Sequence, residues 1–178
     1  MSKEYGEIME EKNKRKLKAF LKEYVPYVLV IILVLCIKRF VVSPIKVNGD
    51  SMLDTLQDGD IMILDIIGYR LSGVKRFDIV VVNAKDEYII KRVIGLPGEK
   101  LEYKDNQLYI NGKKIKENYG KEETEDFSLT IPKDSYFVMG DNRTVSLDSR
   151  YFGPFSKKEI LGKTKFTLFP FGRIGNKE

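Results

Sequence analysis

The chain has 178 residues, 43% of them hydrophobic, and a formal net charge of +5 at pH 7. This is enough for one medium-sized domain with an appendage. The excess positive charge lies before residue 43, because residues 43–178 carry 22 basic and 21 acidic side chains, interleaved along the chain. Such a pattern excludes the basic stripe of a nucleic-acid-binding domain. One cysteine and no histidine exclude an intrachain disulfide and an ordinary zinc site, so we expect no metal and no cofactor.

Residues 1–23 form a charged tail, and an apolar run of 13 residues follows at 25–37. A membrane-spanning helix needs about 20 residues. If the side chains of Lys38 and Arg39 reach toward lipid headgroups, residues 24–42 supply 19. A core helix and a cleaved signal peptide are the alternatives, but no small-x-small cleavage motif follows the run. The pattern predicts an uncleaved transmembrane signal anchor at 24–42.

The charge distribution also predicts an orientation. Six basic residues lie between residues 12 and 22, and positively charged flanks stay on the cytoplasmic side of a membrane. We therefore expect residues 1–23 in the cytoplasm and residues 43–178 as an extracytoplasmic domain on the outer face of the cell membrane.

After Pro44, short runs rich in valine and isoleucine alternate with turn sequences, which is typical of β-strands. Asn111-Gly112 is a strong hairpin signal, and the charged segment 116–126 is typical of a surface loop. The pattern predicts a mainly β fold, an antiparallel sandwich or barrel-like domain. The expected strands are 61–67, 78–83, 88–96, 107–112, 127–131 and 135–140.

Ser51 follows the turn Asn48-Gly49-Asp50, where serine is often only a turn or capping residue. As a nucleophile it would need an activating base. Because the chain has no histidine, the candidate bases are a carboxylate or a neutral lysine, and serine–lysine pairs are a known variant of the catalytic triad.

Lys91 is the lysine best placed to be neutral. Strand alternation puts it on one face with Ile89 and Val93, and burial among apolar side chains lowers the pKa of a lysine. A lysine at a sheet edge is the simpler interpretation, and the pattern alone does not exclude Lys46.

Five motifs in order, after the N-terminal anchor, resemble those of bacterial type I signal peptidase. The ending FTLFPFGRIG (166–175) is similar to the tail of the shorter, Gram-positive-type members, and the resemblance covers nearly all of residues 24–175. The motifs are GDSM (49–52) with Thr55-Leu56, GDIMILDIIGYR (59–70), KRFDIVV (75–81), YIIKRVIGLPGE (88–99) and GDNRTVSLDSRYFG (140–153).

The resemblance implies a role for each matching residue. Ser51 matches the nucleophile and Lys91 the general base, while Ser146 matches a serine whose hydroxyl orients the lysine amine. Asp148 and Arg150 match a structural charge pair, and two residues that are two apart in an extended segment can share a face. The implied substrate pockets, S1 and S3, are lined by Ile45, Val47, Leu56, Ile89 and Ile90, with Met52 beside the nucleophile.

Three positions depart from the family pattern. Asp54 stands where proline is usual, so we expect a less rigid turn after the nucleophile. Phe77 replaces a usual glycine. Gly49 occupies the position at which some relatives have a serine that donates to the oxyanion, which leaves the Ser51 backbone N–H, with water or Thr55, to bind it.

The implied function is a membrane-bound serine endopeptidase with the signal peptidase fold. It would remove signal peptides from secretory preproteins by cutting after small residues at P1 and P3. Its partners would be those preproteins, membrane lipid and the protein-export translocon. The alternatives are a self-cleaving repressor-type protease with the same Ser–Lys chemistry, and a membrane-anchored β-domain that only binds partners.

Overall fold

The computed structural model describes residues 2–40, 42–85, 87–120 and 122–177. Within residues 1–42, side chains are described only for residues 13–35. The chain divides into two compact units, Met1–Val41 and Val42–Glu178.

The first unit consists of helix α1 (Ser2–Phe40), which contains Pro26. Its apolar side chains from Val28 to Leu35 are each half exposed or more. Among the described residues, no helix combines the length and the apolar character needed to cross a membrane. The predicted anchor at 24–42 lies partly outside the described part of the chain, which leaves out residue 41 and the side chains of residues 36–40 and 42.

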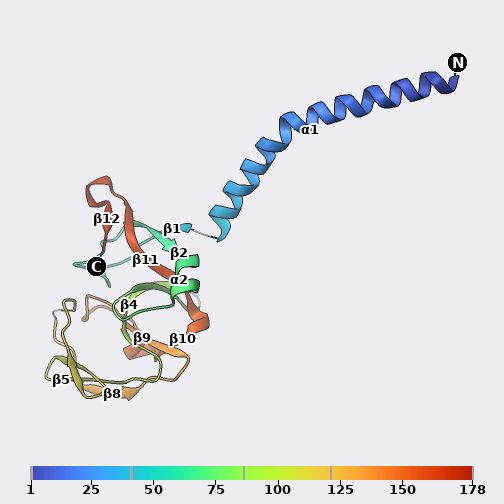
Figure 1. The fold of residues 1–178 in the computed structure, drawn as a ribbon. Helices are drawn as coiled ribbons and strands as arrows, with labels where there is room; N and C mark the ends of the chain where they lie inside the picture. Colours follow the sequence, from blue (N-terminus) through green and yellow to red (C-terminus); the bar gives the residue numbers. More distant parts are fainter. Residues whose placement is uncertain (1, 41, 86, 121, 178) are drawn as a thin grey trace. The chain divides into compact units, whose positions relative to one another are not determined.

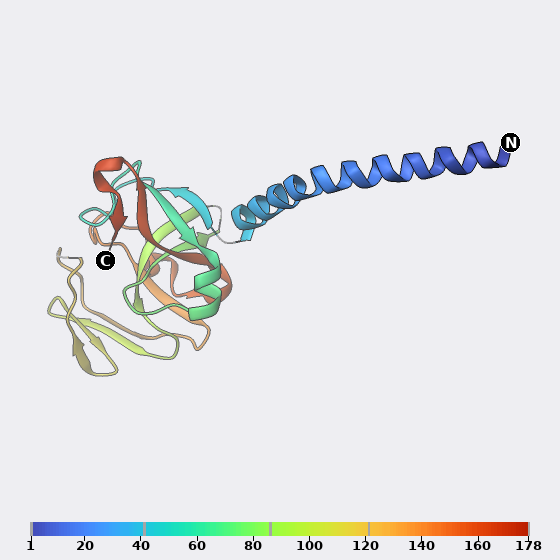
Figure 2. The ribbon, with the colours of Figure 1, turned by 45° about the horizontal axis from the view of Figure 1, so that its top comes forward.

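The second unit is mainly β, with two antiparallel sheets that are seen from two directions in Figures 1 and 2. The larger sheet has eight strands in the order β1-β2-β11-β3-β4-β9-β10, and β12 pairs with β11. Its strands are β1 (Val42–Lys46), β2 (Ile61–Asp65), β3 (Ile79–Ala84), β4 (Glu87–Gly95), β9 (Ser135–Met139), β10 (Phe155–Ser156), β11 (Ile160–Phe169) and β12 (Gly175–Asn176).

The smaller sheet has four strands in the order β7-β6-β5-β8. They are β5 (Lys100–Lys104), β6 (Gln107–Ile110), β7 (Lys113–Ile115) and β8 (Phe127–Thr130). The β6–β7 hairpin predicted at Asn111-Gly112 is confirmed, since both residues have positive φ, 51° and 76°. Two successive positive φ values are the requirement of a type I′ turn.

Four short helices join the strands: α2 (Ile66–Ser72), α3 (Ser149–Phe152), η1 (Lys157–Glu159) and η2 (Phe171–Arg173). The predicted strand 61–67 was wrong at its end. Asp65 is the N-cap of α2, because its Oδ1 accepts a hydrogen bond of 2.7 Å from the Gly68 N–H, and an aspartate in that role begins a helix. Strands β5, β10 and β12 were not predicted. β10 and β12 have only two residues each, and in β5 the buried Leu101 and Tyr103 alternate with charged residues.

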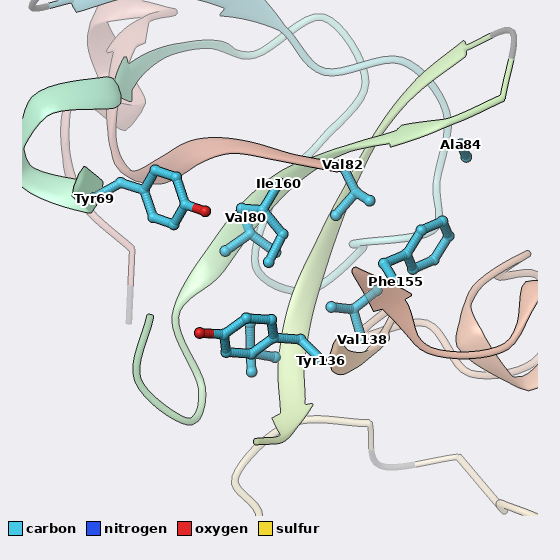
Figure 3. Packing of buried hydrophobic residues seen from close by; sticks show 9 residues of the cluster. Tyr69, Val80, Val82, Ala84, Tyr136, Val138, Phe155 and Ile160 are labelled. Carbon is cyan, nitrogen blue, oxygen red and sulfur yellow. The ribbon is translucent and has the colours of Figure 1, made fainter. Parts of the chain in front are cut away.

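Apolar side chains pack in three clusters. Figure 3 shows the first, which joins α2 to strands β3, β9, β10 and β11 through residues such as Tyr69, Val80, Tyr136 and Phe155. The second connects the two sheets, with Ile94, Leu101, Tyr103, Leu108, Ile110, Ile131, Phe137 and Met139. The third comprises Val47, Met52, Leu56, Met62 and Ile79. It forms the floor beneath the turn that contains Ser51.

The segment 116–126, predicted as a surface loop, contains no helix or strand in its described residues. It is nevertheless docked onto the domain. Thr124 is 3% exposed, and Glu117 and Tyr119 contact the buried side chains of Arg143 and Arg92.

Candidate active site

The structure brings the side chains of Ser51 and Lys91 into contact. Ser51 lies in a turn after β1, in which Thr55 and Leu56 donate backbone hydrogen bonds to the Met52 carbonyl. Lys91 lies in the middle of β4, and its Nζ is 2.6 Å from Ser51 Oγ. Residues 40 apart in the sequence therefore meet at hydrogen-bond distance.

Lys91 is a buried lysine. Its exposed fraction is 4%, and its cross-strand partner Val80 and its neighbour Val93 are fully buried. Burial disfavours the charged ammonium and lowers the pKa of Lys91 to about 8, although the negative charges of Asp148, Glu87 and Asp141 oppose the shift. A tenth or so of such a lysine is neutral at pH 7. Lys46, by contrast, is exposed.

A buried ion pair lies behind this contact. Arg92, next to Lys91 on β4, donates from Nε and Nη2 to the two carboxylate oxygens of Asp141 at 2.8 and 2.7 Å. Thr55 donates its hydroxyl proton to the same carboxylate at 2.5 Å. Sequence reasoning missed this network. The feature of the sequence that could have indicated the network is Arg92, a charged residue between Lys91 and Val93 in an apolar strand. A charged residue that is buried in such a strand requires a partner of opposite charge.

The segment after β9 also holds the nucleophile turn. The Asn142 N–H donates to the Ser51 carbonyl at 3.1 Å. Gly140 lies so close to this carbonyl that a Cβ at position 140 would overlap both Ser51 O and Ser146 Oγ. Only glycine permits this approach of the two backbones.

Asp148 and Arg150 form an ion pair of 2.8 Å. The prediction that these two residues lie in an extended segment was wrong, because Asp148 is the N-cap of α3 and Arg150 lies in that helix. Burial raises the pKa of Asp148, but hydrogen bonds from Arg150 and from the Gly140 N–H outweigh this effect and lower the pKa overall. Ser146 Oγ is buried beside Gly140 and makes no hydrogen bond to Lys91 within the described part of the chain.

A cleft of about 1060 Å³ opens at the Ser51–Lys91 contact. Five of the six predicted pocket residues line it: Ile45, Val47, Met52, Ile89 and Ile90. Leu56 does not. It is fully buried in the third cluster, because the backbone turn from Met52 to Leu56 directs it under the cleft toward Met62.

Backbone geometry accounts for the three unusual positions. Asp54 has φ 78° and Phe77 has φ 70°. Proline could not adopt the first angle, and the second is the conformation for which glycine is suited. Gly49 has φ 80°, and its N–H donates to Asp58 Oδ1 at 2.8 Å. The Thr55 hydroxyl, a candidate oxyanion donor, is instead bound to Asp141.

A family model described as signal peptidase, peptidase S26, matches residues 20–169. The chain belongs to this family. It is therefore a peptidase of the S26 signal peptidase family, and the Ser51–Lys91 cleft lies within the matched region.

Three relatives agree with this assignment by sequence. Signal peptidase I of Bacillus amyloliquefaciens is 40% identical, over 92% of this chain and 96% of that protein. Signal peptidase I S of Bacillus subtilis strain 168 is 39% identical, over 93% and 98%. Signal peptidase IB of Staphylococcus aureus strain Mu50 is 38% identical, over 80% and 86%. A crystal structure of a signal peptidase I from Enterococcus faecalis V583 is 40% identical, with a TM-score of 0.46, and covers 51% of this chain and 95% of that one.

Gly140 leaves no room for a side chain between its backbone and the Ser51 carbonyl. Gly140→Ala should move the Ser51 turn, lowering peptidase activity by tenfold or more and stability by about 1–3 kcal/mol, the usual cost of overpacking. The measurements are preprotein cleavage and thermal unfolding. Gly172→Ala is the matched control, since no atom lies within 4 Å of its added Cβ. Equal activity of the two variants would contradict the proposed contact.

Proposed function

We propose that this chain is a membrane-anchored serine endopeptidase that removes signal peptides from exported preproteins, with Ser51 as the nucleophile and Lys91 as the general base. The observation that carries the proposal is the 2.6 Å contact between Ser51 Oγ and the Nζ of a lysine that is 4% exposed. Burial solves the main difficulty of a lysine base, which is that an ordinary lysine is protonated at neutral pH.

Acylation begins with neutral Lys91. Its amine accepts the hydroxyl proton as Ser51 Oγ attacks the carbonyl carbon of the scissile bond, and the carbonyl oxygen becomes an oxyanion. The Ser51 backbone N–H serves as one oxyanion donor. The Lys91 ammonium then gives its proton to the leaving amine as the C–N bond breaks. The acyl-enzyme remains, and Lys91 is neutral again.

Deacylation repeats the same proton path with water. Lys91 removes a proton from a water molecule that attacks the ester carbon, and returns it to Ser51 Oγ as the C–O bond breaks. The cleaved signal peptide leaves with a free carboxylate. Throughout the cycle, Arg150 neutralises the charge of the nearby Asp148 carboxylate. We assign to Ser146 the role of orienting the Lys91 amine once substrate is bound.

The cleft suits a substrate with small side chains at P1 and P3. Its apolar lining includes Val47 and Met52, which are 2% and 1% exposed and form a packed floor. The described strand order ends at β1, and β9 pairs with β4 only from Arg92 to Gly95. A substrate segment can therefore add as an extended strand beside β1 and the first half of β4. Ile45 and Ile90, which both pack against the third cluster, then contact alternate substrate side chains, while Ile89 faces the other side of β4.

We place the anchor at residues 24–42, with residues 1–23 in the cytoplasm and the catalytic unit on the outer face of the membrane. Support comes from the exposed apolar side chains between Val25 and Leu35 on α1, which are costly in water. Ser51 follows residue 42 by nine positions, at most about 30 Å of extended chain. The nucleophile then works near the membrane surface, where lipid, the translocon and the emerging preprotein meet.

The anchor can be tested by fractionation. The full chain should remain in the membrane pellet after alkaline carbonate washing. Leu29→Arg combined with Ile32→Arg should release it, because each central arginine opposes insertion by about 2.5–3.5 kcal/mol. Leu17→Arg, in the tail, is the control and should stay bound. Recovery of the unaltered chain in the soluble fraction would contradict the anchor.

The nucleophile and base are tested by substitution. Ser51→Ala and Lys91→Met should each lower processing of a secretory preprotein in vesicles by about 10³-fold or more, as loss of an interdependent catalytic residue does. Lys104→Met, at the exposed end of β5, is the control and should keep full activity. Substantial processing by Lys91→Met would exclude Lys91 as the base.

The pKa of Lys91 predicts a pH dependence. Only the neutral amine is active, and its fraction grows as pH rises, so kcat/KM should increase about tenfold per pH unit below its midpoint and level off above pH 8 or so. A midpoint near 10.5, the ordinary lysine value, would contradict the proposal.

Stability supplies an independent control for this titration. The unfolded chain binds more protons at Lys91 than the folded chain between pH 8 or so and 10.5. The free energy of unfolding of the native chain, relative to that of Lys91→Met, should therefore rise with pH in this window and stay flat below it. A flat difference across the whole range would show that the pKa is not shifted.

A further inference from the structure

Tyr119 covers the outer face of the ion pair behind the active site. Its ring lies against the guanidinium of Arg92, with 3.4 Å between Arg92 Cζ and the ring centroid. The same ring packs on Phe77, with 5.7 Å between centroids. Tyr119 comes from the segment that precedes β8, whereas Arg92 lies on β4 of the other sheet. The contact thus joins the connection between β7 and β8 to the strand that carries Lys91.

The edge and the face of the Arg92 guanidinium have different partners. Along the edge, hydrogen bonds run to Asp141, to the Phe77 carbonyl at 2.9 Å and to Thr55 Oγ1 at 3.2 Å. The face is covered by the ring of Tyr119, and Arg92 is 1% exposed as a result. An ion pair that is screened from water in this way is electrostatically stronger than one in contact with solvent.

The residues on either side of Tyr119 are held by Arg143. Glu117 forms an ion pair with Arg143 and accepts a hydrogen bond of 2.5 Å from the Tyr103 hydroxyl. Gly120 packs directly against the Arg143 guanidinium, where a Cβ would overlap it. Arg143 in turn donates to the Gly140 carbonyl at 2.9 Å. Tyr119 is therefore attached to the same segment, 140–143, that binds the Ser51 carbonyl.

We propose that Tyr119 is a positioning residue for the peptidase reaction: by covering Arg92 it holds the Arg92–Asp141 pair in place, and through that pair it fixes the contact between Ser51 and Lys91. The inference rests on the proposed function. The link to the nucleophile is Thr55, which donates to Asp141 from the Ser51 turn. The link to the base is the covalent neighbour relation of Lys91 and Arg92 on β4.

If Tyr119 has this role, its loss should lower kcat and leave KM nearly unchanged. Tyr119 is not among the residues that line the substrate cleft, so substrate binding should be nearly unaffected by its loss. Proton transfer between Ser51 and Lys91 depends on sub-ångström placement of the two atoms. A loosened ion pair behind them should therefore act on kcat.

The test compares Tyr119→Leu and Tyr119→Phe in the full chain, with a signal-peptide-derived peptide as substrate. Tyr119→Leu keeps an apolar side chain but removes the π face, and we expect about a tenfold lower kcat with KM within twofold. Tyr119→Phe keeps the π face and should retain at least half of the native kcat. Tyr109→Leu, on β6 of the smaller sheet, is the control for loss of a half-buried tyrosine.

Unfolding of each variant is followed by circular dichroism, and rates are taken well below the midpoint. Native kcat in Tyr119→Leu, equal losses in the leucine and phenylalanine variants, or a loss expressed in KM alone would each overturn the inference. If the native chain itself fails to cleave the peptide, or if Ser51→Ala cleaves it equally well, the proposed function fails instead, which keeps the two conclusions separable.

Discussion

The ion pair between Arg92 and Asp141 is the interaction on which the arrangement of this site depends. It joins β4, the segment after β9 and, through Thr55, the turn that contains Ser51. Each of these parts is distant from the others in the sequence, and the apolar packing of Met52 and Leu56 beneath the turn lacks the directionality of a hydrogen-bonded ion pair. Breaking a buried pair leaves an uncompensated charge, which costs about 3–5 kcal/mol. The pair therefore locks the three segments in a single relative position.

A second constraint concerns charge around Lys91. The amine must be buried to lose its proton, yet carboxylates are needed nearby to organise the backbone. Each of the two carboxylates is neutralised by a neighbouring arginine: Asp141 is paired with Arg92, and Asp148 is paired with Arg150. The remaining negative field opposes the shift in the pKa of Lys91 only in part, so that burial prevails and the value falls to about 8. Removing either arginine would expose Lys91 to an unbalanced carboxylate and favour its charged form.

The sequence predicted those features that depend on local pattern. Lys91 could be identified as a candidate base because strand alternation surrounds it with apolar residues and the chain has no histidine, and the Asn111-Gly112 hairpin followed from turn chemistry. Features that arise from packing between distant segments could not be predicted. Leu56 lies under the cleft, not in it, because of the turn that starts at Met52. The cover that Tyr119 provides for Arg92 joins a polar loop to a strand, and no periodicity in the sequence encodes that contact.

We propose that this fold supplies a neutral amine to Ser51 near neutral pH. The most direct test is an NMR titration of the Lys91 side chain in the full chain, with ¹⁵N-labelled lysine in detergent micelles and with Lys91→Met to assign the signal. We predict a midpoint near pH 8, below the ordinary lysine value of 10.5. A Lys91 signal with a midpoint near that ordinary value would show that Ser51 has no neutral amine beside it near neutral pH.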